Sequence, residues 1–171
     1  MPLPPHRVRV IVVRHGPAET RDPRRWPDDA QRPLSTKGLQ QTKRVARHLG
    51  RMCGPVAHLA SRPALPARRT AELIGEAVAP PRRVELWPEL QSDRSASPIF
   101  ARLARTVRSN QQTILVGHEP TLAEFVGIAL TGEGVAITHL SKGGAAALEF
   151  PSAMRPGAAR LLWLLTRKQL A

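Results

Sequence analysis

The chain has 171 residues, of which 42% are apolar, and none of its apolar runs approaches the roughly 20 residues needed to span a membrane. This length and composition predict one globular domain, residues 1–171, and argue against a membrane-spanning protein. The formal net charge is +13, and residues 1–83 hold 17 of the 26 basic side chains but only 6 of the 13 acidic ones, so this part of the chain favours an anionic partner.

Apolar strand-like runs alternate with longer amphipathic stretches along the chain. In chain order, the patterns predict a strand at 8–13, a helix from Ser35 or Thr36 to about 52, a strand at 56–60, a helix at 64–78, a strand at 83–87, a helix at 98–109, a strand at 113–117, a helix from Pro120 to about 130, and strands at 144–150 and 159–166. We therefore expect an α/β fold, a three-layer α/β/α sandwich with a mostly parallel sheet and helices on both faces.

Three local features refine this map. The prolines at 17, 23, 27 and 33 exclude a regular helix or a central strand between the first strand and the first helix. Gly38 inside that helix lowers its helix propensity, which predicts close packing against another segment. The run 160–165 is apolar enough for a strand buried on both faces.

Two predicted strands end in a histidine. Arg14-His15-Gly16 follows the run 8–13, and Gly117-His118-Glu119-Pro120 follows the run 113–116. In α/β sheets, the carboxyl ends of the strands are where ligands bind. Either histidine alone is as well explained by an ordinary hydrogen-bonded residue at a strand end, but the two endings together favour chemistry.

The chemistry that suits this pair is phosphoryl transfer through a histidine. A neutral imidazole nitrogen is a nucleophile at cellular pH, and a phosphoryl group in transfer needs cationic donors around its oxygens. Arg14 and His118 are the candidate donors, with His15 as the candidate nucleophile.

The chain resembles the histidine phosphatase superfamily, and within it the small bacterial SixA branch of phosphohistidine phosphatases. The resemblance runs nearly end to end and rests on these segments, which follow the order of the family: Val12-Val13-Arg14-His15-Gly16, Arg32-Pro33-Leu34-Ser35-Thr36-Lys37-Gly38, Ala67-Arg68-Arg69-Thr70-Ala71, Trp87-Pro88-Glu89-Leu90, Val116-Gly117-His118-Glu119-Pro120-Thr121-Leu122 and residues 142–150. It implies a phosphoglycerate-mutase-like fold. It also implies that His15 becomes phosphorylated, that Arg14 and His118 bind the phosphoryl group, and that Glu89 lies where some relatives place an acid.

One position departs from the family pattern. The family usually has an arginine that reaches the phosphate in a Ser-Pro-x-x-Arg-Ala-x-x-Thr segment, and here that place holds Pro66, which has no side-chain donor. Arg62, in the preceding loop, and Arg69, on the following helix, are the candidate substitutes. Either Arg62 compensates, which we favour, or activity is weak, or the chain binds phosphate or phosphohistidine without turnover.

The proton donor is the other open role. Glu89 and Glu119 are the candidates, although Glu119 before a proline also suits the start of a helix. Pro17 stands where SixA proteins often carry an aspartate, so this position supplies no carboxyl group that could act as a proton donor. A phosphohistidine has a better leaving group than a phosphoester and needs less acid catalysis. The replacement of the aspartate by Pro17 therefore favours a substrate with a phosphorus–nitrogen (P–N) bond. The candidate substrate-binding residues are Arg14, Gly16, Arg62, Arg69, His118 and Glu119.

The cysteine, histidine and aromatic content narrow the choice of compartment, cofactors and binding partners. The single cysteine, Cys53, excludes an internal disulfide and is better explained as a packing residue at a helix end than as a nucleophile; no leader peptide is recognisable, so we expect a cytoplasmic protein. Scattered histidines predict no metal, and no cofactor is expected. Only 4% of residues are aromatic, which argues against nucleic acid despite the charge.

The sequence thus leaves two classes of function. The first is a phosphatase that acts on protein phosphohistidine or a small phosphoester through a phospho-His15 intermediate. The second is an impaired family member that binds phosphorylated partners without turnover. A mutase is disfavoured because the short chain has little room for insertions that enclose such substrates.

Overall fold

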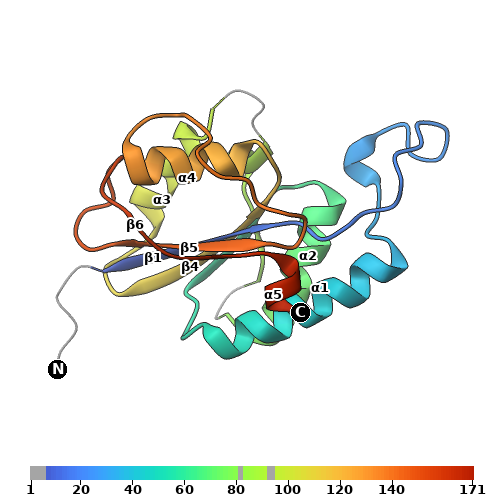
Figure 1. Cartoon of the computed structure of the whole chain (residues 1–171), viewed down its shortest axis with the longest axis horizontal. Helices are drawn as coiled ribbons and strands as arrows, with labels where there is room; N and C mark the ends of the chain where they lie inside the picture. Colours follow the sequence, from blue (N-terminus) through green and yellow to red (C-terminus); the bar gives the residue numbers. More distant parts are fainter. Residues whose placement is uncertain (1–6, 81–82, 92–94) are drawn as a thin grey trace.

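The computed structural model describes residues 7–80, 83–91 and 95–171. Six strands form one sheet in the order β3-β2-β4-β1-β5-β6 (Figure 1). The elements are β1 (Val8–Arg14), η1 (Asp29–Gln31), α1 (Thr36–Met52), β2 (His58–Ser61), α2 (Leu65–Val78), β3 (Glu85–Leu86), η2 (Pro88–Gln91), α3 (Ser97–Thr106), β4 (Gln111–Gly117), α4 (Thr121–Thr131), β5 (Ala145–Phe150), β6 (Arg160–Leu165) and α5 (Arg167–Leu170), where η marks a 3-10 helix. No helix in the described ranges is long and apolar enough to cross a membrane.

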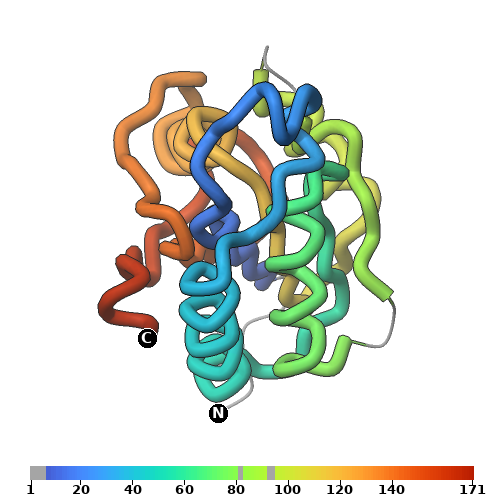
Figure 2. The backbone as a smooth tube through the Cα atoms, turned by 90° about the vertical axis from the view of Figure 1, so that its right-hand side faces the viewer, coloured from blue at the N-terminus to red at the C-terminus, as the bar shows by residue number. Residues whose placement is uncertain are grey.

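The sheet is mixed, and its larger part is parallel. Strands β1, β4, β2 and β3 pair in parallel, while β5 pairs antiparallel with both β1 and β6. Helices α1, α2 and α5 cover one face, where α1 and α2 lie side by side, and α3 and α4 cover the other (Figures 1 and 2). The predicted α/β fold with helices on both faces of a mostly parallel sheet is therefore confirmed.

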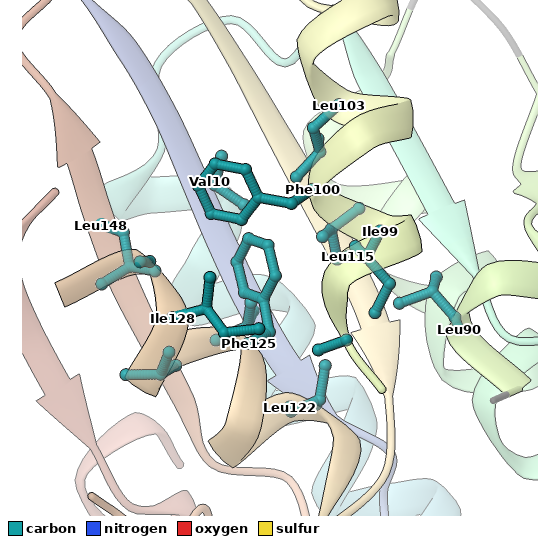
Figure 3. Close-up of a cluster of buried hydrophobic side chains, with 14 of the residues drawn as sticks. Val10, Leu90, Ile99, Phe100, Leu103, Leu115, Leu122, Phe125, Ile128 and Leu148 are labelled. Carbon is teal, nitrogen blue, oxygen red and sulfur yellow. The ribbon is translucent and has the colours of Figure 1, made fainter. Parts of the chain in front are cut away.

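Each face of the sheet has its own hydrophobic core. On the α3/α4 face, Phe100 packs against Phe125 and Phe150 with ring centroids 5.5 Å and 5.6 Å apart, surrounded by aliphatic side chains (Figure 3). On the other face, the apolar side of α1 and α2 packs on side chains such as Ile11 and Ile114. The central strands β1 and β4 contribute to both cores, which is why the runs 10–13 and 114–116 within them are continuously apolar.

The expectation of a doubly buried last strand is wrong. Strand β6 lies at the edge of the sheet, and Leu161 and Leu162 are 46% and 42% exposed. An apolar run predicts a strand but does not show whether other elements cover both faces of that strand. Helix α3 also ends earlier than predicted, at Thr106.

The start of α1 explains why a glycine stands inside it. The Ser35 side chain caps the helix by accepting a hydrogen bond of 3.0 Å from the Gly38 amide, and the Ser35 amide donates to the Pro17 carbonyl. A Cβ at Gly38 would overlap that same Pro17 carbonyl oxygen. The predicted close packing at Gly38 is confirmed, and it ties α1 to the loop that follows β1.

We expect Gly38→Ala to lower the free energy of unfolding by about 2 kcal/mol, although alanine has the higher helix propensity. The cause is the clash with a backbone atom, which cannot rotate away. Urea unfolding of both proteins measures the difference. Gly54→Ala is the matched control, because no atom lies within 4 Å of a Cβ at Gly54. Equal stability of wild type and Gly38→Ala would show that the Pro17 segment moves aside.

Candidate functional site

The carboxyl ends of three adjacent parallel strands bring together residues that are far apart in the sequence. His15 follows β1, His118 follows β4, and Arg62 follows β2. Backbone hydrogen bonds continue past the strand ends: the His15 amide donates to the Gly117 carbonyl at 2.9 Å, and the Arg62 amide donates to the Val116 carbonyl at 2.9 Å. The register of the sheet therefore fixes the place of all three residues.

The His15 ring has a defined orientation. Its Nδ1 lies 2.8 Å from the Gly16 carbonyl oxygen. Because a carbonyl oxygen only accepts, Nδ1 carries the proton and Nε2 of the neutral ring carries the lone pair. Burial lowers the pKa of His15 to about 4; the Gly16 carbonyl opposes this shift, and the nearby charges of Arg14, His118 and Lys142 add to it. At neutral pH, His15 is thus an uncharged imidazole among cationic side chains.

The lowered pKa of His15 predicts how the free energy of unfolding depends on pH. In the unfolded chain, His15 binds a proton at an ordinary pKa near 6.5, whereas in the fold it does so only near pH 4. The unfolded state therefore binds more protons between these values, and stability falls as the pH drops through this window. We expect wild type to lose up to about 3 kcal/mol more than His15→Asn between pH 7 and pH 4.

Urea unfolding of both proteins across this pH range measures that difference, and the comparison cancels the carboxylates that titrate in both. Parallel stability curves for wild type and His15→Asn would contradict the lowered pKa of His15.

Arg14 is held by the loop before β5. Its Nη1 donates to the Leu140 carbonyl at 2.8 Å and lies 3.4 Å from His139 Nε2. The Glu119 carboxylate in turn accepts from the Leu140 amide at 2.8 Å and from the Ala123 amide at 3.1 Å. Burial lowers the pKa of Arg14, and the Glu119 charge opposes this shift. Glu119 thus joins the start of α4 to the loop that positions Arg14, which agrees with the helix-start interpretation of this residue.

Lys142 is a cation near His15 that the sequence reasoning did not select. The next residue, Gly143, has a positive φ of 76° and donates its amide to the Arg14 and His15 carbonyls, both at 3.1 Å. This turn places the Lys142 charge where it lowers the pKa of His15. The sequence signal for Lys142 is the Lys-Gly-Gly run directly before the strand predicted at 144–150.

A small cavity opens beside His15. Its lining residues come from the turn after β1, η1 and its flank, and the start of α2: His15, Asp29, Ala30, Arg32, Arg62, Ala64, Pro66 and Ala67. Arg62 therefore reaches the cavity at which Pro66 lies. Arg69 instead pairs with Glu72, Nη1 to Oε2 at 3.0 Å, and does not line this cavity.

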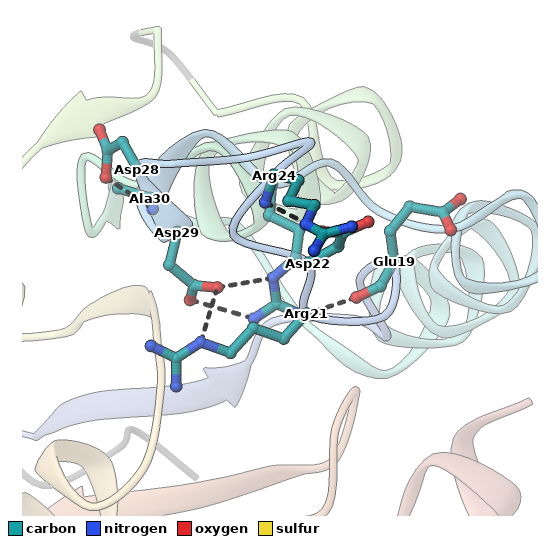
Figure 4. Close-up of polar contacts among 8 residues, drawn as sticks. Glu19, Arg21, Asp22, Arg24, Asp28, Asp29 and Ala30 are labelled. Carbon is teal, nitrogen blue, oxygen red and sulfur yellow. Dashed lines mark hydrogen bonds and ion pairs between the residues drawn. The ribbon is translucent and has the colours of Figure 1, made fainter.

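Arg32 is a second cation of the cavity that was missed as a site residue. Its guanidinium donates to both carboxylate oxygens of Asp29, at 2.9 Å and 3.1 Å, and to the Glu19 carbonyl at 2.6 Å (Figure 4 shows the contacts around Asp29). The proline-rich loop offers several arginines, and no periodicity in it tells which one turns inward. The sequence signal for Arg32 is its place in the Arg-Pro-Leu-Ser segment directly before the first helix.

Gly16 is required for close packing. Its amide donates to the Thr70 hydroxyl at 3.1 Å, and that hydroxyl donates to the Pro66 carbonyl at 2.8 Å. A Cβ at Gly16 would overlap Thr42 Oγ1. Because Gly16 has no side chain, the turn that carries His15 can pack directly against α1 and α2.

Glu89 lies in η2, and its carboxylate pairs with Arg102 of α3. Both of its carboxylate oxygens accept from Arg102 Nη1, at 3.1 Å and 2.9 Å, and the Arg102 guanidinium stacks over the Trp87 ring at 4.6 Å. The structure therefore does not bring Glu89 to the residues that line the His15 cavity.

Burial raises the pKa of the Cys53 thiol to about 11, which supports a packing role for Cys53 at the end of α1.

The chain is similar to known proteins in sequence and in fold. A model of the histidine phosphatase superfamily (branch 1) matches residues 10–95. An uncharacterized protein of Picosynechococcus sp. is 32% identical over 155 residues, which cover 90% of this chain and 88% of that protein.

Solved structures share the fold. The protein histidine phosphatase SixA complexed with tungstate has a TM-score of 0.80 at 22% identity and covers 95% of this chain and 99% of its own. The putative phosphohistidine phosphatase SixA from Agrobacterium tumefaciens has a TM-score of 0.73 at 22% identity, with coverages of 92% and 97%. A phosphoserine phosphatase from Entamoeba histolytica has a TM-score of 0.67 at 16% identity, with coverages of 96% and 100%.

Proposed function

The chain belongs to the histidine phosphatase superfamily (branch 1), and from this premise we propose that it hydrolyses phosphate from protein phosphohistidine, or from a small phosphoester, through a phospho-His15 intermediate. The observation that carries the proposal is the His15 ring, whose Nδ1 is held by the Gly16 carbonyl and which lines a cavity with Arg32 and Arg62. Similar folds described as phosphohistidine and phosphoserine phosphatases support both substrate classes.

In the first step, His15 Nε2 attacks phosphorus, and the bond from phosphorus to the leaving nitrogen or oxygen breaks with its electron pair going to the leaving group. The lone pair is available at neutral pH because the pKa of His15 is about 4. Arg14 and His118 neutralise the charge on the transferring oxygens, with Arg62 in the role that Pro66 cannot fill. Arg14 is preoriented for this by its bond to the Leu140 carbonyl.

In the second step, water attacks the phosphorus of phospho-His15 and the bond to Nε2 breaks. The electron pair returns to Nε2, and the two protons of the water leave with orthophosphate or to solvent. Nδ1 keeps its proton throughout, because the Gly16 carbonyl accepts that hydrogen bond in both states of the ring. The turn after β1 thus supports a nucleophile that is regenerated without a separate base.

The arrangement of carboxylates favours a nitrogen leaving group. Glu89 accepts two hydrogen bonds from Arg102, and Glu119 accepts from two backbone amides, so the oxygens of both carboxyl groups are already engaged as acceptors. An alkoxide leaving group needs a proton from a nearby acid, whereas an imidazole that already carries a proton on its distal nitrogen leaves as a neutral ring without a further one. We therefore place protein phosphohistidine before phosphoesters as the substrate.

The test is a hydrolysis assay of wild type with an aryl phosphate and with a phosphohistidine-bearing protein. We expect release of orthophosphate from both and, after an alkaline quench during turnover, phosphate on the peptide that contains His15. Alkali is used because phosphohistidine is labile in acid. Phosphate release without label on that peptide would contradict the His15 intermediate.

The burial of Pro66 at the cavity supports a second candidate, a protein that binds phosphohistidine without turnover. This candidate is favoured if neither substrate is hydrolysed while the phosphohistidine-bearing protein still binds. It also predicts that Pro66→Arg creates activity that wild type lacks.

A further inference from the structure

Asp29 stands out among the residues around His15. Of the described residues that line the His15 cavity, Asp29 carries the only carboxylate. It lies on η1, in the proline-rich loop between β1 and α1. The family resemblance had pointed to Glu89 and Glu119, and neither of these lines the cavity.

Arginines hold Asp29 in place. Arg32 Nε and Nη2 donate to the two carboxylate oxygens at 2.9 Å and 3.1 Å, and Arg21 Nε lies 3.8 Å from Oδ1 (Figure 4). The hydrogen bond from Arg32, with the charges of Arg32, Arg21 and Arg62, holds the pKa of Asp29 below its usual range even though exposure to solvent is high. At neutral pH, Asp29 is therefore an acceptor of hydrogen bonds and does not supply protons.

The carboxylate keeps capacity for a further partner. A pair of parallel hydrogen bonds from one guanidinium uses one lone pair of each oxygen, and about four are present. The Asp29 side chain is 50% exposed, so part of its surface is open to a ligand that enters beside His15.

An ionised carboxylate discriminates between leaving groups. It repels the negative charge that develops on an oxygen leaving group and gives it no proton. An imidazole protonated on its distal nitrogen, in contrast, presents an N–H donor, and it departs as a neutral ring when the P–N bond breaks.

We propose that Asp29 accepts the hydrogen bond of the distal ring N–H of a substrate phosphohistidine and thereby selects P–N over P–O substrates. The inference rests on the proposed function of His15. As His15 Nε2 bonds to phosphorus, the P–N bond of the substrate breaks, its electron pair goes to the substrate ring, and the distal proton stays where it was. Both imidazole rings then have their distal N–H bonded to an acceptor. The Gly16 carbonyl accepts from the His15 ring, and the Asp29 carboxylate accepts from the substrate ring.

The experiment compares kcat/KM of wild type and Asp29→Asn on a phosphohistidine-bearing protein, on phosphoimidazole and on an aryl phosphate. Asparagine keeps the shape of Asp29 and removes its charge. We expect a loss of about 10- to 100-fold on both P–N substrates and a change within about twofold on the aryl phosphate. Asp28→Asn is the matched control, since Asp28 caps the Ala30 amide in the same loop, and it should leave all three substrates unchanged.

Other outcomes overturn the inference. An equal loss on all three substrates would show that Asp29 only positions Arg32, and a loss on the protein alone would show a surface contact. No loss on any substrate would leave Asp29 without a role in turnover. Failure of the proposed function is recognised separately, because wild type would then hydrolyse none of the three substrates, or His15→Ala would keep the activity of wild type, whatever Asp29→Asn does.

Discussion

Replacing His15 with alanine should lower kcat for both an aryl phosphate and a phosphohistidine-bearing protein by about 10³-fold or more, because the covalent route is lost with the nucleophile. The fold should persist, since the hydrogen bond of the imidazole goes to the carbonyl of its sequence neighbour Gly16 and joins no distant segment. Initial rates and quench labelling of the same preparations measure the effect.

His48→Ala is the control for this variant, because His48 lies on α1 and outside the lining of the His15 cavity. It should keep the turnover of wild type. Residual activity of His15→Ala within tenfold of wild type, with normal urea unfolding, would rule out the phospho-His15 intermediate.

Replacing Arg62 with alanine should lower kcat/KM about 100-fold, which is the typical effect of removing one charged donor to a transferring phosphoryl group. The reason is that Arg62 lines the cavity at which Pro66 takes the place of the family arginine. The backbone at this position should not change, because the Arg62 amide donates to the Val116 carbonyl in either protein. Steady-state kinetics on the aryl phosphate measures the loss.

Arg69→Ala is the matched control for Arg62→Ala. Arg69 pairs with Glu72 on the surface of α2 and should tolerate the change with activity within about twofold of wild type. If Arg62→Ala keeps full turnover, Arg62 does not compensate for Pro66. A large loss in Arg69→Ala alone would show that the helix arginine reaches the phosphate instead.

Sequence patterns predicted most of the fold because the central strands are apolar on both sides, because α1 begins at a side-chain cap, and because α2 and α3 begin with a proline in their first turn. Ser35 caps α1 where the sequence placed a cap, and the two histidines follow adjacent strands, β1 and β4. The neighbours of β6 could not be predicted, since an edge strand and a central strand can share the same apolar composition.

The site was predicted in part for a similar reason. Residues next to a strand end, such as His15, are positioned by the sheet, so their place follows from the strand prediction. Arg32 and Lys142 are positioned by loops, and Arg32 reaches the cavity through its bonds to Asp29 and the Glu19 carbonyl. Glu89 and Glu119 were selected by resemblance, and their hydrogen-bond partners depend on tertiary contacts that no local pattern records.

The position of β1 in the sheet has a consequence for how the protein is made. Among the strands of the described residues, β1 is synthesised first, yet its neighbours in the sheet are β4 and β5, from residues 111–117 and 145–150. The turn that carries His15 is likewise bonded to Gly117 and Gly143. Until those segments are synthesised, β1 has no strand with which to pair. The contacts that orient His15 therefore form only after residues 111–150 have been synthesised, and a shorter chain carries His15 without them.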